Sequence, residues 1–135
     1  MAHGTPDWVR MVQVAVTVNN VPVVPEPATE LAAGDADKYS GTDTTYQTVA
    51  TWTVGASKVG ELKEIIILSD DYAHTLVQIT VGTVTWCTGW TPQGAMPIIF
   101  EDLKLAAASI VKVEAKSSDG TAIVVDAIIV GKEIG

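Results

Sequence analysis

Residues 109–130 carry the strongest structural signal in this chain, and they read SIVKVEAKSSDGTAIVVDAIIV. Apolar and charged side chains alternate through residues 110–116, which is the period of a strand with one dry face and one wet face. Asp119 and Gly120 then stand between two apolar runs, a strong signal for a hairpin turn. The sequence therefore predicts an antiparallel hairpin at the C-terminal end of the chain.

The returning half of this hairpin, residues 121–130, is apolar on both faces apart from Asp126. In an antiparallel sheet one face usually meets water, so the second apolar face needs a cover. We expect that cover to be another copy of the chain, or the chain's own N-terminal arm. Asp126 should find a hydrogen-bond partner, because a lone buried carboxylate is costly. The residues expected at this interface are Ile123, Val125, Asp126, Ile128 and Ile129.

Composition limits the kinds of partner. The 135 residues are 47% hydrophobic, which is enough for one domain with a core. The net charge is -8 and no Lys/Arg cluster offsets it, so nucleic acid is disfavoured as a binding partner. Cys87 is the only cysteine, so no intrachain disulfide can form. The N-terminus lacks the pattern of a secretory signal, and no apolar run reaches the roughly 18 residues of a membrane span. We expect a soluble protein made in the host cytoplasm, with no membrane partner.

The N-terminal third predicts an arm. Residues 8–18 read WVRMVQVAVTV, where β-branched residues recur with period two, so this segment is expected to be a strand. Three prolines follow within residues 21–27 and hold the backbone extended. Residues 28–45 are small, acidic and glycine-containing, which is typical of a loop. We therefore assign residues 1–45 to an arm and linker, and residues 46–135 to the folded domain. The arm residues expected at an interface are Trp8, Val12, Val14 and Val16.

An energy argument says what the arm should do. Fixing the backbone of one residue costs roughly 1–2 kcal/mol, so ordering about 40 arm residues costs on the order of 40–80 kcal/mol. A fully buried valine returns only about 1.5–3 kcal/mol. An isolated arm cannot balance that cost, so it either stays mobile or its strand pairs with a sheet edge, for which the edge of a neighbouring subunit is a common choice.

The body of the chain predicts an all-β fold. Short apolar runs are separated by turn signals, and no segment has a convincing helical period. This pattern favours an antiparallel β-sandwich, with the jelly roll as the preferred topology and an immunoglobulin-like arrangement as the alternative. The connections over residues 88–95 and 101–108 would serve as crossovers. The predicted strands cover residues 46–54, 61–68, 74–81, 83–87, 96–100, 110–116 and 121–130.

No group of residues predicts catalysis. Asp70, Asp71 and His74 could ligate a metal beside Ser69, but their spacing matches no metal or hydrolase signature, and an acidic turn is the simpler interpretation. The acidic residues of the linker could hold calcium, but the order of a calcium-binding loop is absent. We expect no enzymatic activity, no metal and no cofactor. The linker residues in question are Asp35, Asp37 and Asp43.

The tryptophans suggest two different roles. Trp52 lies in a predicted strand and is expected in the core. Trp86 and Trp90 flank Cys87, and aromatic side chains on a sandwich can stack on sugar rings. Trp90 falls in a predicted loop and is the better candidate for exposure. Cys87 itself is expected to be a buried, inert thiol.

Three segments give the body a family resemblance: TWTVGASKVGELKEI at 51–65, PIIFEDLKL at 97–105 and VKVEAKSSDG at 111–120. Over residues 46–133 the chain resembles small jelly-roll proteins of tailed-phage particles, namely capsid decoration (cement) proteins and head-fibre or tail-associated modules. Extended arms that reach across neighbours are usual in such proteins. The resemblance implies trimers seated on the local axes of a capsid, with the major capsid protein as partner and without catalysis or cofactor.

Two functional hypotheses follow. The first is a structural virion protein on the capsid surface, a trimeric decoration protein that stabilises the phage head through contacts made by the arm. The alternative is a carbohydrate- or receptor-binding β-sandwich module of a phage fibre or tail, in which Trp86 and Trp90 contact the ligand.

Overall fold

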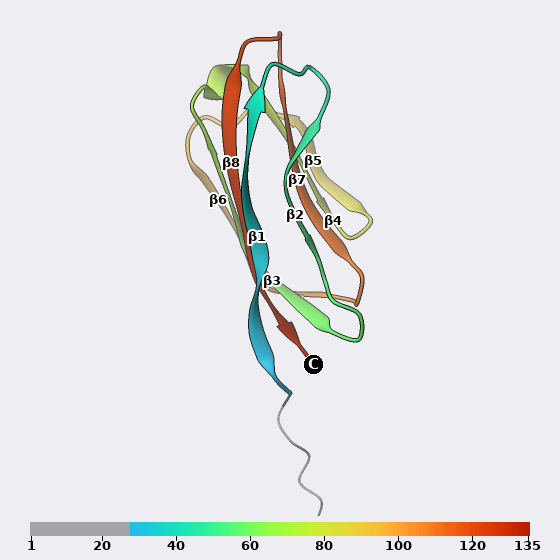
Figure 1. The fold of residues 1–135 in the computed structure, drawn as a ribbon. Helices are drawn as coiled ribbons and strands as arrows, with labels where there is room; N and C mark the ends of the chain where they lie inside the picture. The colour runs from blue at the N-terminus through green and yellow to red at the C-terminus, as the bar shows by residue number, and fades with distance from the viewer. Residues whose placement is uncertain (1–27) are drawn as a thin grey trace, which may run out of the picture.

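The computed structural model describes residues 28–135, which form eight β-strands and one short 3-10 turn (Figure 1). The predicted arm strand, with Trp8, Val12, Val14 and Val16, lies outside the described residues. Within 28–135 no helix has the length and apolar character that crossing a bilayer would need. The elements are β1 (Glu30–Gly41), β2 (Gln47–Thr53), β3 (Val59–Ser69), η1 (Tyr72–His74), β4 (Thr75–Val81), β5 (Val84–Trp90), β6 (Met96–Leu105), β7 (Ile110–Ser117) and β8 (Ile123–Ile134).

The strands form two four-stranded antiparallel sheets that face each other (Figure 1). The strand order is β1-β8-β3-β6 in one sheet, called the β1 sheet below, and β2-β7-β4-β5 in the other, the β2 sheet. The pairing is nested: first strand with last, second with seventh, third with sixth, fourth with fifth. This is the jelly-roll arrangement, so the predicted all-β sandwich and its preferred topology are confirmed.

The core lies between the sheets and follows the predicted alternation. In β7, Val111, Val113 and Ala115 are fully buried, while the residues between them are partly exposed. Trp52 of β2 is also buried, as expected. Its ring lies against Gly60 and Gly131, where any added Cβ would come within 3.3 Å of the indole. Two glycines in the β1 sheet thus make room for the largest side chain of the core.

Strand β1 corrects the predicted linker. Residues 28–45 were expected to be a loop, yet β1 pairs with β8 along its whole length, from Glu30 opposite Ile134 to Gly41 opposite Ile123. Its small and acidic residues carry little β propensity, so the strand depends on backbone pairing with β8. One of its acids also ties the sheets together, because Asp35 Oδ2 accepts a 3.0 Å hydrogen bond from the backbone N–H of Thr51 in β2. The folded domain therefore includes β1 and begins before residue 46.

Strand β6 is longer than predicted. It continues through residues 101–105, which were expected to be a connection. Its register against β3 shifts between Leu62 and Glu64, and Glu101 takes a positive φ of 57°. This bulge breaks the period of two, which is why the second half of the strand was not recognisable from the sequence.

Strand β8 corrects part of the predicted interface. Ile123, Val125 and Ile129 are at most 2% exposed and face the chain's own core. They cannot contact another copy while the sandwich stays folded. The residues between them point to the outer face of the β1 sheet, and that face is described next.

Candidate functional site

The outer face of the β1 sheet carries a band of apolar side chains. The strand register places Ala36, Ile128, Ile66 and Pro97 side by side, one from each of the four strands. In the neighbouring row Val130 and Ile99 flank Glu64, and Ile99 is 71% exposed. We call this band the β1-sheet face; its residues are Ala36, Ile66, Leu68, Pro97, Ile99, Ile128 and Val130.

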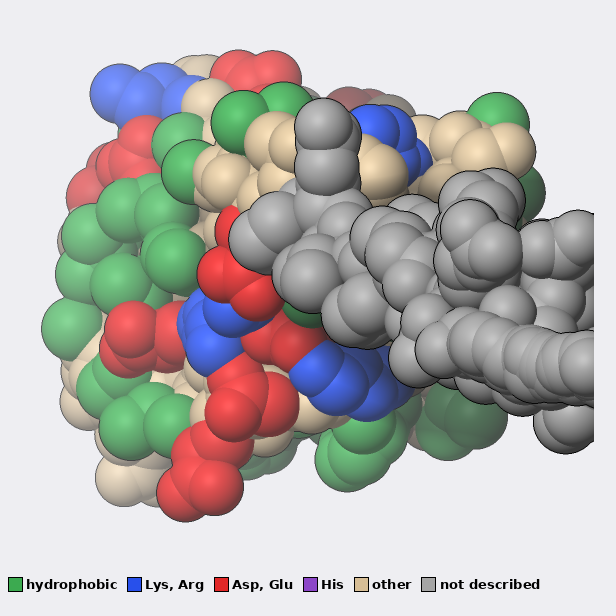
Figure 2. All heavy atoms as spheres, turned by 90° about the horizontal axis from the view of Figure 1, so that it is seen from below, with side chains coloured by type: hydrophobic (Ala, Val, Ile, Leu, Met, Phe, Trp, Pro, Cys, Tyr) green, Lys and Arg blue, Asp and Glu red, His purple; other side chains and the backbone are tan. Residues whose placement is uncertain are grey.

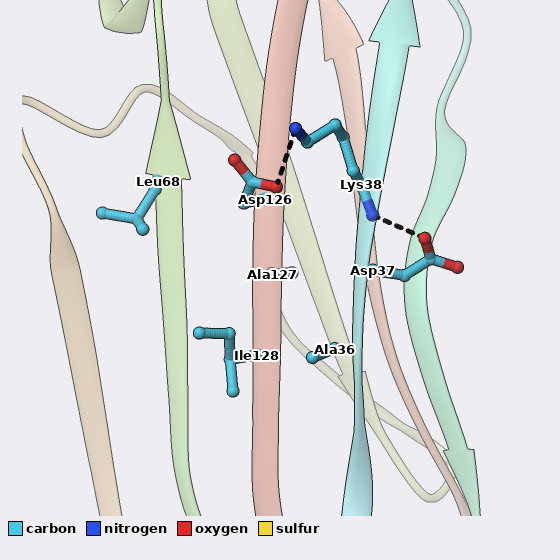
Figure 3. A pocket seen from close by; sticks show the side chains of 7 residues that line it. All are labelled: Ala36, Asp37, Lys38, Leu68, Asp126, Ala127 and Ile128. Carbon is cyan, nitrogen blue, oxygen red and sulfur yellow. Dashed lines mark hydrogen bonds and ion pairs between the residues drawn. The ribbon is translucent and has the colours of Figure 1, made fainter.

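A depression of about 450 Å³ lies on this face (Figure 3). Figure 3 shows the side chains of Ala36, Leu68 and Ile128 reaching it from β1, β3 and β8. At its rim Lys38 Nζ lies 3.8 Å from Asp126 Oδ1, and both side chains are largely exposed. Asp126 was expected to find a polar partner, and Lys38 of its own chain takes that place. An exposed pair at this distance contributes little stability.

One end of the β1-sheet face is charged. The carboxylate of Glu61 is only 5% exposed and is contacted by three lysines: Lys132 at 3.4 Å, Lys63 at 3.5 Å, and Lys104. The side chain of Lys63 also pairs with Asp102, and this hydrogen bond lowers the pKa of that carboxyl group. Figure 2 shows red and blue side chains gathered at this end, with hydrophobic side chains beside them on the left of the view. The apolar face therefore has a defined charged border.

A second apolar site lies at the edge of the sandwich where β5 and β6 end the two sheets. It is a pocket of about 360 Å³, which we call the aromatic pocket, lined by Ile79, Trp86, Cys87, Trp90, Ile98 and Phe100. The rings of Trp86 and Phe100 meet edge to face with centroids 5.4 Å apart. Burial raises the pKa of the Cys87 thiol, so the thiol remains protonated near neutral pH.

Irregular pairing between β4 and β5 builds this pocket. Trp90 lies opposite Val77 and Cys87 opposite Ile79, with two register shifts along the pair. Val77 and Ile79 face the core, and paired residues of neighbouring strands point to the same side, so Trp90 and Cys87 both lie on the inner side. In a regular strand, residues three apart would point to opposite faces, and the register shifts remove this difference. Trp90 was predicted in a loop, but it is the last residue of β5.

The lining of the aromatic pocket defines what it can bind. Trp86 and Trp90 are 55% and 40% exposed, so both rings are accessible. None of the six lining residues carries a carboxylate, an amide, a hydroxyl or a cationic group. An apolar ring would therefore be well accommodated, whereas the hydroxyl groups of a buried sugar would find few partners.

The acidic turn after β3 is a structural element. Asp70 Oδ1 accepts a 2.8 Å hydrogen bond from the backbone N–H of Val124, which joins this turn to β8. Asp71 caps η1 by accepting from the backbone N–H of His74, and its Oδ2 lies 2.8 Å from His74 Nδ1. The Nε2 atom of the same ring lies 3.6 Å from Asp119 Oδ2 in the β7–β8 turn. Within residues 28–135 no three His, Cys, Asp or Glu side chains are placed to hold a metal ion.

The acids of the predicted linker lie apart and have separate roles. Asp35 bonds to Thr51 as described, Asp37 accepts from the backbone N–H of Lys38, and Asp43 accepts a 2.8 Å hydrogen bond from the Tyr39 hydroxyl. Burial is the main cause of the raised pKa of Tyr39. These contacts are those of a folded strand and its turn.

The structure thus brings together only some of the predicted site residues. Trp86 and Trp90 share the aromatic pocket, and Asp126 and Ile128 both line the depression on the β1-sheet face. Phe100 and Ile98 were not identified as site residues from the sequence. They alternate with the exposed Ile99, which is the pattern of a strand with two different faces.

No protein family and no curated protein sequence matches this chain. Among solved structures, the chain is similar to the CBM36-1 domain of a multidomain xylanase from the hindgut metagenome of Trinervitermes trinervoides. The two are 13% identical with a TM-score of 0.38, and the match covers 79% of this chain and 97% of that domain.

Proposed function

We propose that this chain is a structural protein without catalytic activity, which assembles with copies of itself as a trimer and acts as a capsid decoration protein on a phage head. The observation that carries the proposal is the β1-sheet face, an apolar band that crosses all four strands of one sheet in an otherwise acidic chain. The resemblance of residues 46–133 to jelly-roll proteins of tailed-phage particles supports the same role.

The physical argument is one of burial. Removing apolar surface from water stabilises an assembly by roughly 25 cal/mol per Å². Contiguous exposed apolar patches rimmed by polar groups mark sites of protein association. The β1-sheet face has such a rim, because Lys38 and Asp126 border one end and the Glu61 lysine cluster borders the other. A second copy is the occupant that we propose for this face.

Charge substitutions on the two sheets test the proposal. Ile99→Glu and Val130→Glu place a carboxylate on the β1-sheet face at exposed positions, so each should fold and yet lower the assembled fraction in light-scattering measurements. Ile110→Glu is the matched control, because Ile110 is 45% exposed but belongs to the β2 sheet. If all three variants assemble like the parent protein, the β1-sheet face is not the interface.

Location on a particle needs a separate measurement. Antibodies raised against the purified chain can be used for gold labelling of phage particles from the same source. The proposal expects gold on the surface of the head, in contact with the major capsid protein. Gold confined to fibres or tails would contradict the decoration role and favour the second candidate function, a module of a fibre or tail.

The second candidate is a carbohydrate- or receptor-binding module of a fibre or tail. It is favoured by the exposed Trp86 and Trp90 rings beside Phe100 in the aromatic pocket. A glycan array tests it, with Trp90→Ala as the variant that should lose any binding seen with the parent chain. The lack of polar side chains in the lining makes assembly the better supported role.

A further inference from the structure

We propose that the aromatic pocket receives Trp8 of a second copy, and that residues 8–18 of that copy add as a strand along the β5–β6 edge of the sandwich. This inference rests on the self-assembly proposed above and specifies which segment and which site make one of its contacts.

The pocket is chemically suited to a large apolar ring. Trp86 and Phe100 already meet edge to face, and a third aromatic ring could pack against the accessible faces of Trp86 and Trp90. Cys87 and Ile98 supply the rest of the apolar surface. Because the lining offers almost no hydrogen-bonding groups, a ligand with several hydroxyl groups would leave more polar atoms without partners than an indole ring, which has a single N–H.

The two long edges of the sandwich differ. At one edge β1 and β2 are tied together by the Asp35 carboxylate and the backbone N–H of Thr51. All four edge strands pair with one neighbour each, but at the other edge, among the residues that the structure describes, no hydrogen bond joins β5 to β6. Edge strands with unpaired N–H and C=O groups are the usual sites of strand addition. The aromatic pocket opens at this second edge.

The N-terminal segment has the sequence that such an edge requires. Trp8 is the only aromatic residue of the Phe, Trp or Tyr type among residues 1–27. The valines at positions 12, 14, 16 and 18 are separated from Trp8 by even numbers of positions. In an extended strand, Trp8 and these valines would share one face. That face could close the gap between the sheets while the backbone pairs with the edge.

Composition favours a second copy over the same chain. Length permits either, because an extended segment of 27 residues spans about 90 Å, whereas a four-stranded sheet is only about 15 Å across. Pro22, Pro25 and Pro27 restrict the backbone just before β1 and favour an extended spacer, which opposes the turn needed to double back to the pocket of the same chain.

Disulfide trapping in the full-length protein tests the inference, because the native Cys87 lines the pocket. Asp7→Cys, Val9→Cys and Arg10→Cys place a single new thiol beside the retained Trp8. Under mild oxidation we expect disulfide-linked oligomers on non-reducing gels, with the new cysteine joined to Cys87 in peptide maps. Thr53→Cys, an exposed position on β2, is the control for random oxidation and should give several-fold less product. Adding Trp8→Ala to each variant should lower the yield.

Each result has a distinct meaning. A disulfide to Cys87 within one chain would overturn the assignment to a second copy. No disulfide to Cys87 in a protein that still sediments as an oligomer would overturn the pocket assignment but leave the proposed assembly intact. No disulfide in a protein that sediments as a monomer would overturn both.

Discussion

The rings of Trp86 and Phe100 meet at an interplanar angle of 84°, and this contact joins β5 of one sheet to β6 of the other at the open edge of the sandwich. The closed edge is held instead by a hydrogen bond from a backbone N–H to a carboxylate. The jelly roll therefore has one polar, closed edge and one aromatic, accessible edge, and the second is where we expect ligand contact.

Replacing Trp86 should affect contacts more than stability. An aromatic pair of this kind contributes about 0.5–1.5 kcal/mol beyond its burial, and Trp86 is more than half exposed. Trp86→Ala should therefore lower the free energy of unfolding by about 1 kcal/mol, measured by urea titration. Trp52→Ala leaves a cavity in the core and should lower the free energy of unfolding by about 3–5 kcal/mol. Equal losses for the two variants would show that the pocket is part of the core.

Glu133 should be important for stability although it lies near the C-terminus. Its Oε1 accepts 3.0 Å hydrogen bonds from the indole N–H of Trp52 and from the backbone N–H of Gly55. Glu133→Ala leaves both donors without this acceptor and should cost about 1–3 kcal/mol of unfolding free energy. Glu133→Gln keeps an acceptor oxygen and should lose less. If the two variants are equally stable, these hydrogen bonds do not contribute.

Gly34 should resist substitution. Its φ is +130°, and an added Cβ would lie 1.9 Å from the carbonyl oxygen of Ile129 in β8. Gly34→Ala should therefore disturb the β1–β8 pairing. Backbone strain should lower the free energy of unfolding by about 1–3 kcal/mol, and the clash should lower it further. Gly94→Ala is the control, since nothing lies within 4 Å of the added Cβ there. Thermal unfolding of both variants gives the comparison, and a Gly34 variant as stable as the control would contradict the register of β1.

His74 should make stability depend on pH. The hydrogen bond to Asp71 and the attraction of that carboxylate raise the pKa of His74 above its ordinary value of 6.5, and Asp119 adds to the effect. The protonated ring therefore favours the folded state. Its contribution is complete below pH 6.5 and is lost as the pH rises through the higher folded-state pKa.

The measurement is urea unfolding at several values between about pH 6 and pH 8, the range in which histidine titrates. The parent protein should lose stability relative to His74→Gln as the pH rises through this range. Parallel curves for the two proteins would show that the Asp71–His74 contact does not contribute. The pKa of Asp119 is lowered, chiefly by its hydrogen bond with Thr121. The protonation of Asp119 therefore affects stability only at acid pH, outside the range of this measurement.

The sandwich could be predicted because its central strands alternate cleanly. In β7 each buried Val or Ala is followed by a charged residue, so the sequence shows the buried face directly. Strand β1 could not be found in this way. Its residues are small and acidic, and its pairing with β8 becomes apparent only when the backbone register is known.

The candidate sites were only partly predictable for a similar reason. Trp86 and Trp90 stood out by residue type, but the register shifts that bring them beside Phe100 leave no period in the sequence. The apolar return strand β8 correctly indicated that one sheet carries an apolar outer face. It did not show which residues face outward, and Ile123, Val125 and Ile129 proved to be core residues.

The central claim is that copies of this chain cover the β1-sheet face for one another. Sedimentation equilibrium of the unmodified full-length protein, over a range of micromolar concentrations, tests it most directly. The account predicts a mass three times that of one chain, and a lower mass for the Val130→Glu variant. A mass of one chain at every concentration, with the parent protein folded and stable, would contradict it.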